Sequence, residues 1–374
     1  MKSRLFMLLT WLVTLAGVGL LWSVARIDEV QTEPLFQLRI PPPEVFVALL
    51  CVSVLGGIYL AAHGLWKLRT ERSAAIIRCF GGLGTLCATG SFVHEIFTND
   101  DSAIPVNGDV NKPHEPVQKL RLFCLNVLHG HPDFPQHNDR FEATARILCH
   151  FKADVMIFQE VWNTNEHGNM ADRSSANMNR PLNYAYARAN GSRSRIGFEE
   201  GAAILSGLPI IEAKRMLLKP REPWWENRIA LMTKLDLGGG ETLTLVGVHL
   251  SDSAAAASQA DYLLEIMREH SPDLIAGDFN STPDACAVQA MLKQGYSTAT
   301  PMIAIHGMKQ FELPDQLIRE PPIDHVFLSR AFRERFSVEE VAWVVTSKPV
   351  TGDDIHQRIA ISDHNAILVD LKRR

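Results

Sequence analysis

The sequence predicts an α/β domain in which two β-sheets pack together with helices outside, preceded by a separate apolar region. Nine strand-like runs recur between residues 120 and 371, whereas only three segments there have clear helical spacing. Because many strands and few helices share one stretch of about 255 residues (120–374), two packed sheets flanked by helices are expected. The first hundred residues of the 374-residue chain differ in composition from the rest, because they contain long uncharged runs.

The expected elements follow from the spacing of apolar residues and from the turn residues between them. The strand-like runs are short, apolar and bounded by Gly, Pro, Asn or Asp. They cover 120–127, 154–161, 202–205, 229–235, 243–250, 274–279, 323–328, 338–345 and 366–371. Helical spacing of apolar residues predicts helices over 139–151 and 254–270, and a third helix over 283–294 begins with a Pro.

The N-terminal region predicts two to three transmembrane helices within residues 1–97. Residues 5–25 carry no charge and are long enough to cross a bilayer. A signal peptide is the alternative, because Lys2 and Arg4 precede the run. A second apolar run at 45–66 favours a retained helix. A third at 79–93 is shorter and Gly-rich, so it is either a span or a helix packed on the other two.

The charges between these runs predict an orientation. Basic residues cluster between the second and third runs: Lys67, Arg69, Arg72 and Arg78. The positive-inside rule then places this loop and the N-terminus in the cytoplasm. Three crossings would leave the globular part extracytoplasmic, in a periplasm or on an exoplasmic face. Residues 98–119 are polar and aperiodic and are interpreted as a linker to a globular domain at 120–374.

Composition narrows the classes of function. The net charge is −5 and acidic residues outnumber basic ones from residue 111 onward, so there is no global basic signature for nucleic acid. The six Cys are scattered, and none forms a pair with metal or redox spacing. We interpret them as small hydrophobic residues, and no zinc site is indicated.

The segment "LIAGDFNSTP" (274–283) is the first candidate for a functional site. It begins as a buried strand and ends in polar residues. Asp278 and Asn280 are two residues apart, so in an extended chain both side chains would leave one face. A carboxylate beside an amide suits a metal ion or a phosphate, although Asp and Asn are also common in ordinary turns.

Polar residues of the same few kinds follow other strands. Each alone is compatible with a satisfied core residue or a solvated side chain. Together they predict one site where strand ends meet. They are Asn126 in "CLNV", Gln159 and Glu160 in "FQEV", His249 in "GVHLS", Asp324 in "IDHVFLS", and Asp363 and His364 in "ISDHNAILV".

The order "LN", "QE", "HL", "GDFN", "ID", "SDH" resembles the endonuclease/exonuclease/phosphatase superfamily. The resemblance covers 120–371 and extends to "EGAAILSGLPI" and "ENRIALMTKLDL", which are similar to the mid-domain strands of that group. It implies a four-layer α/β sandwich, with two packed mixed sheets flanked by helices. It also implies one divalent metal at an edge of the sheets, Mg2+ or, as the alternative, Mn2+. It does not cover the first hundred residues.

The resemblance also implies a role for each motif residue. It places Glu160, Asn126 and Asp363 on the metal side, and oxygen ligands of this kind suit a hard cation. The expected catalytic residues position the attacking water and the phosphate and orient the final imidazole: His249, Asp278, Asn280, Asp324 and His364. Arg228 is expected near the substrate. Whether Asp278 or His364 takes the proton of the water stays open.

Three functions remain open at this point. The first is a phosphodiesterase on a lipid head group or another envelope phosphoester, with a lipid bilayer and the phosphoester as partners. The second is an extracytoplasmic nuclease, supported by a basic stretch between Arg188 and Arg228 that is interleaved with Glu. The third is a non-catalytic membrane-tethered binding domain, which intact motifs disfavour. No obligate protein partner is indicated.

Overall fold

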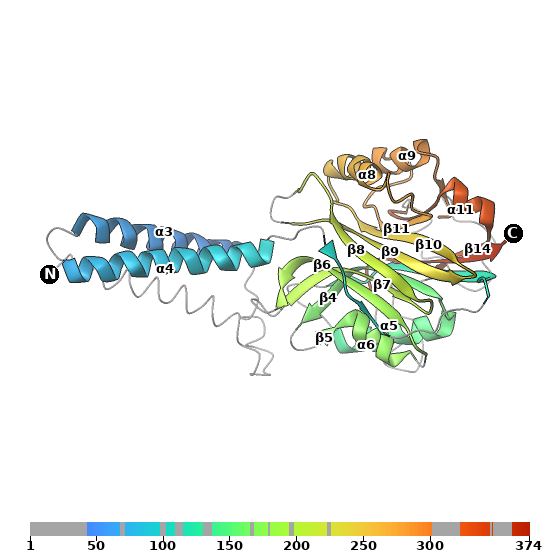
Figure 1. Ribbon diagram of the computed structural model, residues 1–374, viewed down its shortest axis with the longest axis horizontal. Coiled ribbons are helices and arrows are strands. Elements are labelled where there is room, and N and C mark those ends of the chain that lie inside the picture. The colour runs from blue at the N-terminus through green and yellow to red at the C-terminus, as the bar shows by residue number, and fades with distance from the viewer. Residues whose placement is uncertain are drawn as a thin grey trace.

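The structure is a computed structural model. It describes residues 43–67, 72–97, 102–108, 115–129, 137–164, 168–178, 180–193, 198–222, 226–300, 322–344, 346 and 361–374. Figure 1 shows two sheets packed face to face, with helices on both outer sides and a pair of helices extending away as an arm. The prediction of two packed mixed sheets with helices outside is confirmed.

The first sheet has seven strands in the order β1-β8-β9-β10-β11-β13-β12. The parallel pair β10–β11 makes this sheet mixed, since its other neighbours are antiparallel. The strands are β1 (Ser102–Ala103), β8 (Ile210–Leu217), β9 (Ile229–Gly238), β10 (Glu241–His249), β11 (Leu274–Asp278), β12 (Ser297–Thr298) and β13 (Asp324–Leu328).

The second sheet has eight strands in the order β14-β15-β3-β4-β7-β6-β2, with β5 paired to β4. Its parallel pair is β3–β4. The strands are β2 (Val106–Asn107), β3 (Lys119–Asn126), β4 (Val155–Thr164), β5 (Gly168–Asn169), β6 (Asn183–Ser192), β7 (Phe198–Ser206), β14 (Phe336–Val344) and β15 (Ala366–Arg373).

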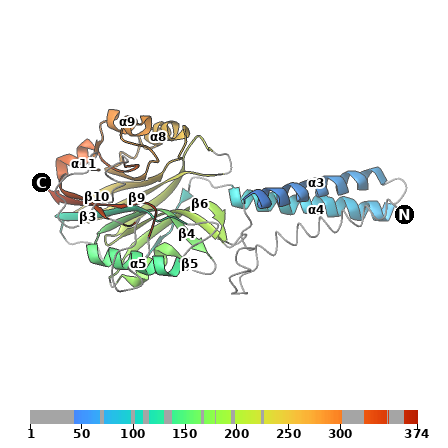
Figure 2. The same cartoon turned by 180° about the vertical axis from the view of Figure 1, so that it is seen from behind.

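Three apolar layers hold the sheets and helices together. One lies between the sheets and includes Leu122, Ile157 and Leu245, all buried. A second lies between the eight-stranded sheet and the helices α5 (His137–Phe151) and α6 (Met170–Asn177). A third packs the seven-stranded sheet against α8 (Ala255–Ile266) and α9 (Cys286–Lys293), and α11 (Arg330–Arg335) follows β13. Figure 2 shows this helix–sheet–sheet–helix arrangement from behind.

All nine predicted strands are present, but β6 and β8 were not predicted. β6 alternates buried small residues, mostly Ala, with half-buried Tyr and Arg, and Ala is a weak strand signal. β8 carries Glu212, Lys214 and Arg215, which belong to the basic stretch interleaved with Glu. Both patterns were missed because one face of each strand stays partly exposed, and strand pairing needs no continuous apolar run.

The described part of the predicted linker contains two short strands, β1 and β2. Ser102 pairs with Arg215 in one sheet, and Val106 pairs with Ala185 in the other. These contacts are made by backbone groups, so hydrophobic periodicity could not reveal them. Among the cysteines, Cys124 is buried as expected, whereas Cys149 and Cys286 are exposed.

The arm consists of α3 (Pro43–Lys67) and α4 (Arg72–Phe97), which lie side by side (Figures 1 and 2). Small residues permit the close approach: a Cβ on Gly82 would lie 2.6 Å from the backbone oxygen of Gly57. Large apolar side chains point outward, including Leu55, Trp66 and Phe80 at 66%, 74% and 73% exposure.

None of the helices that the structure describes is both long and apolar enough to cross a membrane. The predictions that 45–66 and 79–93 are spans fall on α3 and α4 and are therefore not supported. The predicted span at 5–25 lies outside the described residues.

Candidate active site

Five of the predicted site residues meet at one edge of the two sheets because of strand register. In one sheet, Asn126 ends β3 beside Gln159 of the parallel strand β4, and Glu160 follows. In the other, His249 ends β10 beside Asp278, which ends β11 and faces Asp324 at the start of β13. The ends of parallel strands lie at the same edge, so packing the two sheets brings these side chains together.

One carboxylate oxygen of Asp278 is the hub of the site. Its Oδ2 accepts a hydrogen bond from Asn126 Nδ2 at 3.0 Å. The Nε2 atoms of His249 and His364 lie 3.5 and 3.7 Å from the same oxygen. Burial, followed by the neighbouring charge of Asp324, raises the pKa of Asp278 to about 7.

Asp324 and His364 form a direct pair. His364 Nδ1 lies 2.8 Å from Asp324 Oδ2, which leaves Nε2 facing Asp278. Burial acts to lower the pKa of His364, but the charge and hydrogen bond of Asp324, with the charge of Asp278, raise it to about 10. Asp324 therefore holds the ring of His364 with Nε2 toward Asp278, and the catalytic role of the pair stays a prediction.

Glu160 sits at a break in strand pairing. The β4–β7 register shifts between Phe158 and Val161, and Glu160 has a φ of 54°. Its Oε1 accepts from Asn126 Nδ2 at 3.0 Å, and its Oε2 accepts from the backbone N–H of His129 at 3.1 Å. Although burial opposes it, the charges of His129 and His249 and these hydrogen bonds lower the pKa of Glu160 to about 2.

The side-chain amides of Asn126 and Asn280 both make hydrogen bonds within the protein. Asn126 Oδ1 accepts from the backbone N–H of Leu128 at 3.0 Å, so its amide nitrogen, not its oxygen, faces Glu160 and Asp278. Asn280 has a φ of 46°, and its Nδ2 donates to the Leu250 carbonyl. The extended chain expected from Asp278 to Asn280 is thus wrong, because the strand ends at Asp278 and the backbone turns.

Arg228 reaches the site from the start of β9. Its Nη1 lies 2.9 Å from His249 Nε2 and 3.0 Å from Nδ1, and its Nη2 lies 2.9 Å from Glu226 Oε1. Its Nε is buried and has no hydrogen-bond partner among the described residues. Burial and then the charge of Arg228 lower the pKa of His249 well below its usual value, so this imidazole is neutral.

Asp363 stands apart from the cluster. It is exposed, and its Oδ1 lies 3.3 Å from Ser362 Oγ. Within the described part of the chain, one group of three acids and histidines has ligand atoms within 4.8 Å of one another, namely Asp278, Asp324 and His364. This trio differs from the expected set of Asn126, Glu160 and Asp363.

Two site residues were not predicted. His129 binds Glu160 through its backbone and places its ring 5.8 Å from that of Phe198. Arg140 lies on α5 and is only 3% exposed. Helical spacing could have found Arg140, because it shares the buried face of α5 with Thr144 and Leu148. His129 lies three residues after the end of β3, and no sequence signal marks it.

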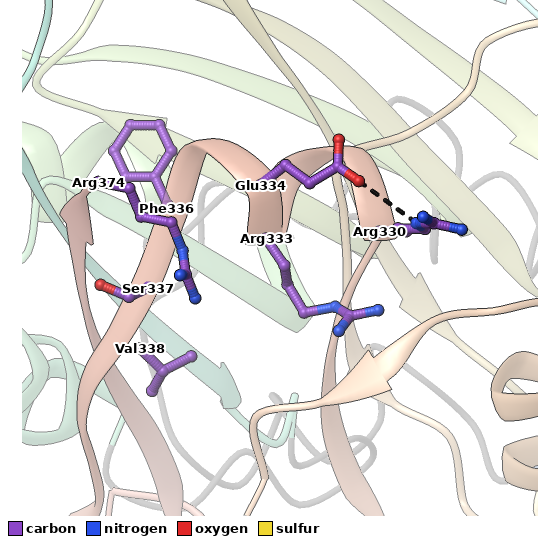
Figure 3. A pocket seen from close by; sticks show the side chains of 7 residues that line it. All are labelled: Arg330, Arg333, Glu334, Phe336, Ser337, Val338 and Arg374. Atoms are coloured by element: carbon purple, nitrogen blue, oxygen red, sulfur yellow. Dashed lines mark hydrogen bonds and ion pairs between the residues drawn. The ribbon is translucent and has the colours of Figure 1, made fainter.

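A hollow elsewhere on the surface shares no residue with this cluster. It has a volume of about 580 Å³ and lies beside α11, at the end of β13 away from Asp324. Figure 3 shows Arg330 paired with Glu334 at its rim, with Arg333, Phe336 and Arg374 around it.

Several solved structures share the fold of this chain. A protein from Leptotrichia buccalis described as an endonuclease/exonuclease/phosphatase family protein superposes with a TM-score of 0.51 at 14% identity, covering 68% of this chain and 99% of that one. The human Nocturnin catalytic domain with bound sulfate gives 0.50 at 14% identity, covering 72% and 97%. An endonuclease/exonuclease/phosphatase from Beutenbergia cavernae gives 0.50 at 18% identity, covering 68% and 72%.

Sequence comparison gives a shorter match and a family. A UPF0294 protein of Vibrio campbellii is 29% identical over 133 residues, which are 34% of this chain and 45% of that protein, so the match spans less than half of the relative. The model of the Endonuclease/Exonuclease/phosphatase family matches residues 124–364, which is well over half of the chain and includes nearly all of the site. The chain therefore belongs to the Endonuclease/Exonuclease/phosphatase family.

Proposed function

We propose that the protein is a divalent-metal-dependent phosphoester hydrolase, and specifically a phosphodiesterase acting on a lipid head group or another envelope phosphoester. The observation that carries this proposal is the convergence on Asp278 Oδ2 of one amide and two imidazoles, His249 and His364, beside the carboxylate of Glu160. Such a set can activate water, hold a phosphate and supply a proton at one point.

The donor set fits a hard divalent cation. Asp278 is 1% and Asp324 5% exposed, and the raised pKa of Asp278 reflects the cost of two buried carboxylates in proximity. Glu160 is charged at any physiological pH. Glu160 Oε1 and Asp278 Oδ2, which each lie 3.0 Å from Asn126 Nδ2, would hold the ion, Mg2+ first and Mn2+ second. When bound, the ion would polarise the phosphoryl group and offset its charge.

Asp278 and His364 suit opposite roles in proton transfer. With a pKa near neutral, Asp278 can accept the proton of a water molecule at Oδ2. His364, held charged by Asp324, can donate a proton from Nε2 to the leaving oxygen. Neutral His249 and cationic Arg228 lie 2.9 Å apart beside this position and would bind the phosphate oxygens.

Charge favours a lipid or small phosphodiester over nucleic acid. The chain has a net charge of −5. In the basic stretch that supported a nuclease, Arg188 donates to Gly191 and Arg215 donates to the Arg188 carbonyl, so both guanidinium groups have bonds within the protein. The exposed apolar side chains of the arm, such as Leu55 and Phe80, are also compatible with a lipid surface. A nuclease remains the second candidate.

Assaying several phosphoesters in parallel distinguishes the candidate substrates. Purified full-length protein with Mg2+ is offered vesicles containing phosphatidylglycerol or sphingomyelin, single- and double-stranded DNA, and bis(4-nitrophenyl) phosphate. We expect release of the lipid head group, and none with excess EDTA. Cleavage of DNA alone would replace the lipid proposal by the nuclease. Absence of hydrolysis on every substrate, with Mg2+ or Mn2+, would favour a non-catalytic binding domain.

We also propose that the N-terminal region attaches the catalytic domain to a membrane, with the domain on the extracytoplasmic side. The support is the uncharged run 5–25, because Lys2 and Arg4 precede it and the positive-inside rule places such residues in the cytoplasm. A reporter enzyme that is active only outside the cytoplasm, fused after Arg374, should be active. Activity of a cytoplasm-only reporter at the same position would contradict this placement and move the substrate to the cytoplasmic face.

A further inference from the structure

Arg140 is a buried cation that binds backbone carbonyls through two of its nitrogens. The guanidinium lies on the first turn of α5 and is 3% exposed. Its Nη2 donates to the carbonyls of Val127 and Leu128, and its Nε donates to the Ile361 carbonyl at 2.8 Å. Its Cζ lies 4.9 Å from the centre of the Trp162 ring, and Nη1 has no hydrogen-bond partner among the described residues.

The three carbonyls belong to two segments that carry the site. Val127 and Leu128 follow Asn126 and precede His129, whose backbone N–H binds Glu160. Ile361 precedes Ser362, Asp363 and His364. Ser362 Oγ makes a second link between the segments, because it donates to the Asn126 carbonyl at 2.5 Å. Arg140 therefore joins the Asn126 side of the site to the His364 side through a planar, rigid group.

The backbone at this contact is in an unusual conformation. Leu128 has a φ of 52°, in the left-handed region that non-Gly residues seldom adopt. Such a conformation persists where surrounding bonds hold it. Here the Leu128 carbonyl accepts from Arg140 and its N–H donates to Asn126 Oδ1. The turn that orients Asn126 is thus fixed from outside the site.

A second arginine provides a comparison at the far end of the same elements. Arg121 of β3 binds Asp370 of β15 through Nε at 2.6 Å and Nη2 at 2.5 Å, and its Nη1 donates to the carbonyl of Phe151, the last residue of α5. Arg121 and Arg140 therefore each join α5, the β3 side and the β15 side. Arg121 does so at the edge away from the site and Arg140 at the edge that carries it.

We propose that Arg140 is a positioning residue, which fixes the loop after β3 against the loop before β15 and so sets Asn126 and Glu160 in register with His364. This inference rests on the proposed phosphoester hydrolysis for its kinetic consequence, but its structural part does not. Loosening the contact should disturb the geometry of the reacting groups more than the binding of substrate. It should therefore lower kcat with little change in KM.

The test compares Arg140→Lys with the matched control Arg121→Lys. Lysine keeps the charge but cannot bind carbonyls of both loops with one planar fork. We expect faster hydrogen–deuterium exchange in peptides covering 126–129 and 361–364, a fall in kcat of about 10–100-fold, and a higher Mg2+ concentration at half-maximal rate. Arg121→Lys should leave these two peptides and the Mg2+ requirement unchanged, whatever it does to Tm.

The outcomes separate the inference from the proposed function. Parental exchange in both peptides and parental kcat in Arg140→Lys would overturn the inference, as would equal effects from Arg121→Lys. A parent that hydrolyses no phosphoester would contradict the proposed function, yet the exchange measurement would still test the link between the loops. If Arg140→Lys does not fold, Ser362→Ala removes the second link with a smaller change. It should then raise exchange in the same two peptides, and parental exchange there would overturn the inference.

Discussion

Replacing Glu160 by Gln is expected to reduce Mg2+-dependent hydrolysis by on the order of a thousandfold, because a bound cation is worth several kcal/mol to the transition state. The change keeps the shape of the side chain. The amide oxygen of the introduced glutamine can still accept from Asn126, as Glu160 Oε1 does at 3.0 Å. What is lost is the carboxylate charge, which the surroundings hold with a pKa of about 2, and the acceptor for the backbone N–H of His129, because an NH2 group replaces Oε2. Rates are measured with Mg2+, with EDTA, and after Mg2+ is restored.

A matched control separates the lost charge from general damage. Glu334 is a carboxylate of α11, the helix that follows β13, and it is 68% exposed and paired with Arg330. Glu334→Gln should keep parental kcat and KM, since an exposed pair contributes little. Parental activity of Glu160→Gln, or activity of the parent that survives EDTA, would contradict the metal assignment. If Glu160→Gln loses activity and also has a lowered Tm, its circular dichroism is compared with that of the parent. A parental spectrum assigns the loss to the missing charge, and an altered spectrum assigns it to the fold.

The sheets could be predicted because their strands bury continuous apolar runs. β3, β4, β10 and β11 are buried along most of their length, and each was found from its apolar residues. β6 and β8 were missed because half of each strand is partly exposed and carries polar or small residues. The pairing of Ser102 and Val106 with the sheets depends on backbone groups, which every residue has.

The site was predicted as a set of residues but not as a geometry. Residue types at strand ends indicated Glu160, His249 and Asp278, because strand register brings such positions to one edge. The turns that aim the side chains depend on positive φ angles at Leu128, Glu160 and Asn280, all of them non-Gly. Tertiary contacts impose these conformations, and the local sequence opposes them. The displacement of Asp363 from the cluster and the inward amide nitrogen of Asn126 could not be foreseen for the same reason.

The pair of Asp324 and His364 allows a double-mutant test. If Asp324 acts only by orienting and charging His364, through the 2.8 Å contact at Nδ1, the two residues form one functional unit. His364→Ala should cost about a hundredfold or more in kcat/KM, which is the usual contribution of a proton donor. Asp324→Ala should cost nearly as much at pH 8. The double variant should be little worse than His364→Ala alone.

The dependence on pH distinguishes charging from orientation. In the parent, His364 stays protonated up to about pH 10, chiefly because of Asp324, whereas burial alone would lower its pKa. Asp324→Ala removes the carboxylate but leaves the ring buried, so the pKa of His364 should fall below its usual value. The imidazole then loses its proton as the pH rises through this lower value. The basic limb of the pH–rate profile should therefore move to lower pH, and the deficit of Asp324→Ala should shrink as the pH is lowered.

The measurement is kcat/KM for the parent, the two single variants and the double variant on one substrate between pH 5 and 9. His325 lies next to Asp324 in sequence, is fully buried and bonds the Ser281 carbonyl through Nε2 at 2.8 Å, away from the hub. His325→Gln therefore serves as the control for disturbance of β13 and should leave the shape of the pH–rate profile unchanged. Additive losses from His364→Ala and Asp324→Ala at every pH would mean that the residues act separately. Asp324 would then serve the site through Asp278, whose pKa it also raises, and not through the imidazole.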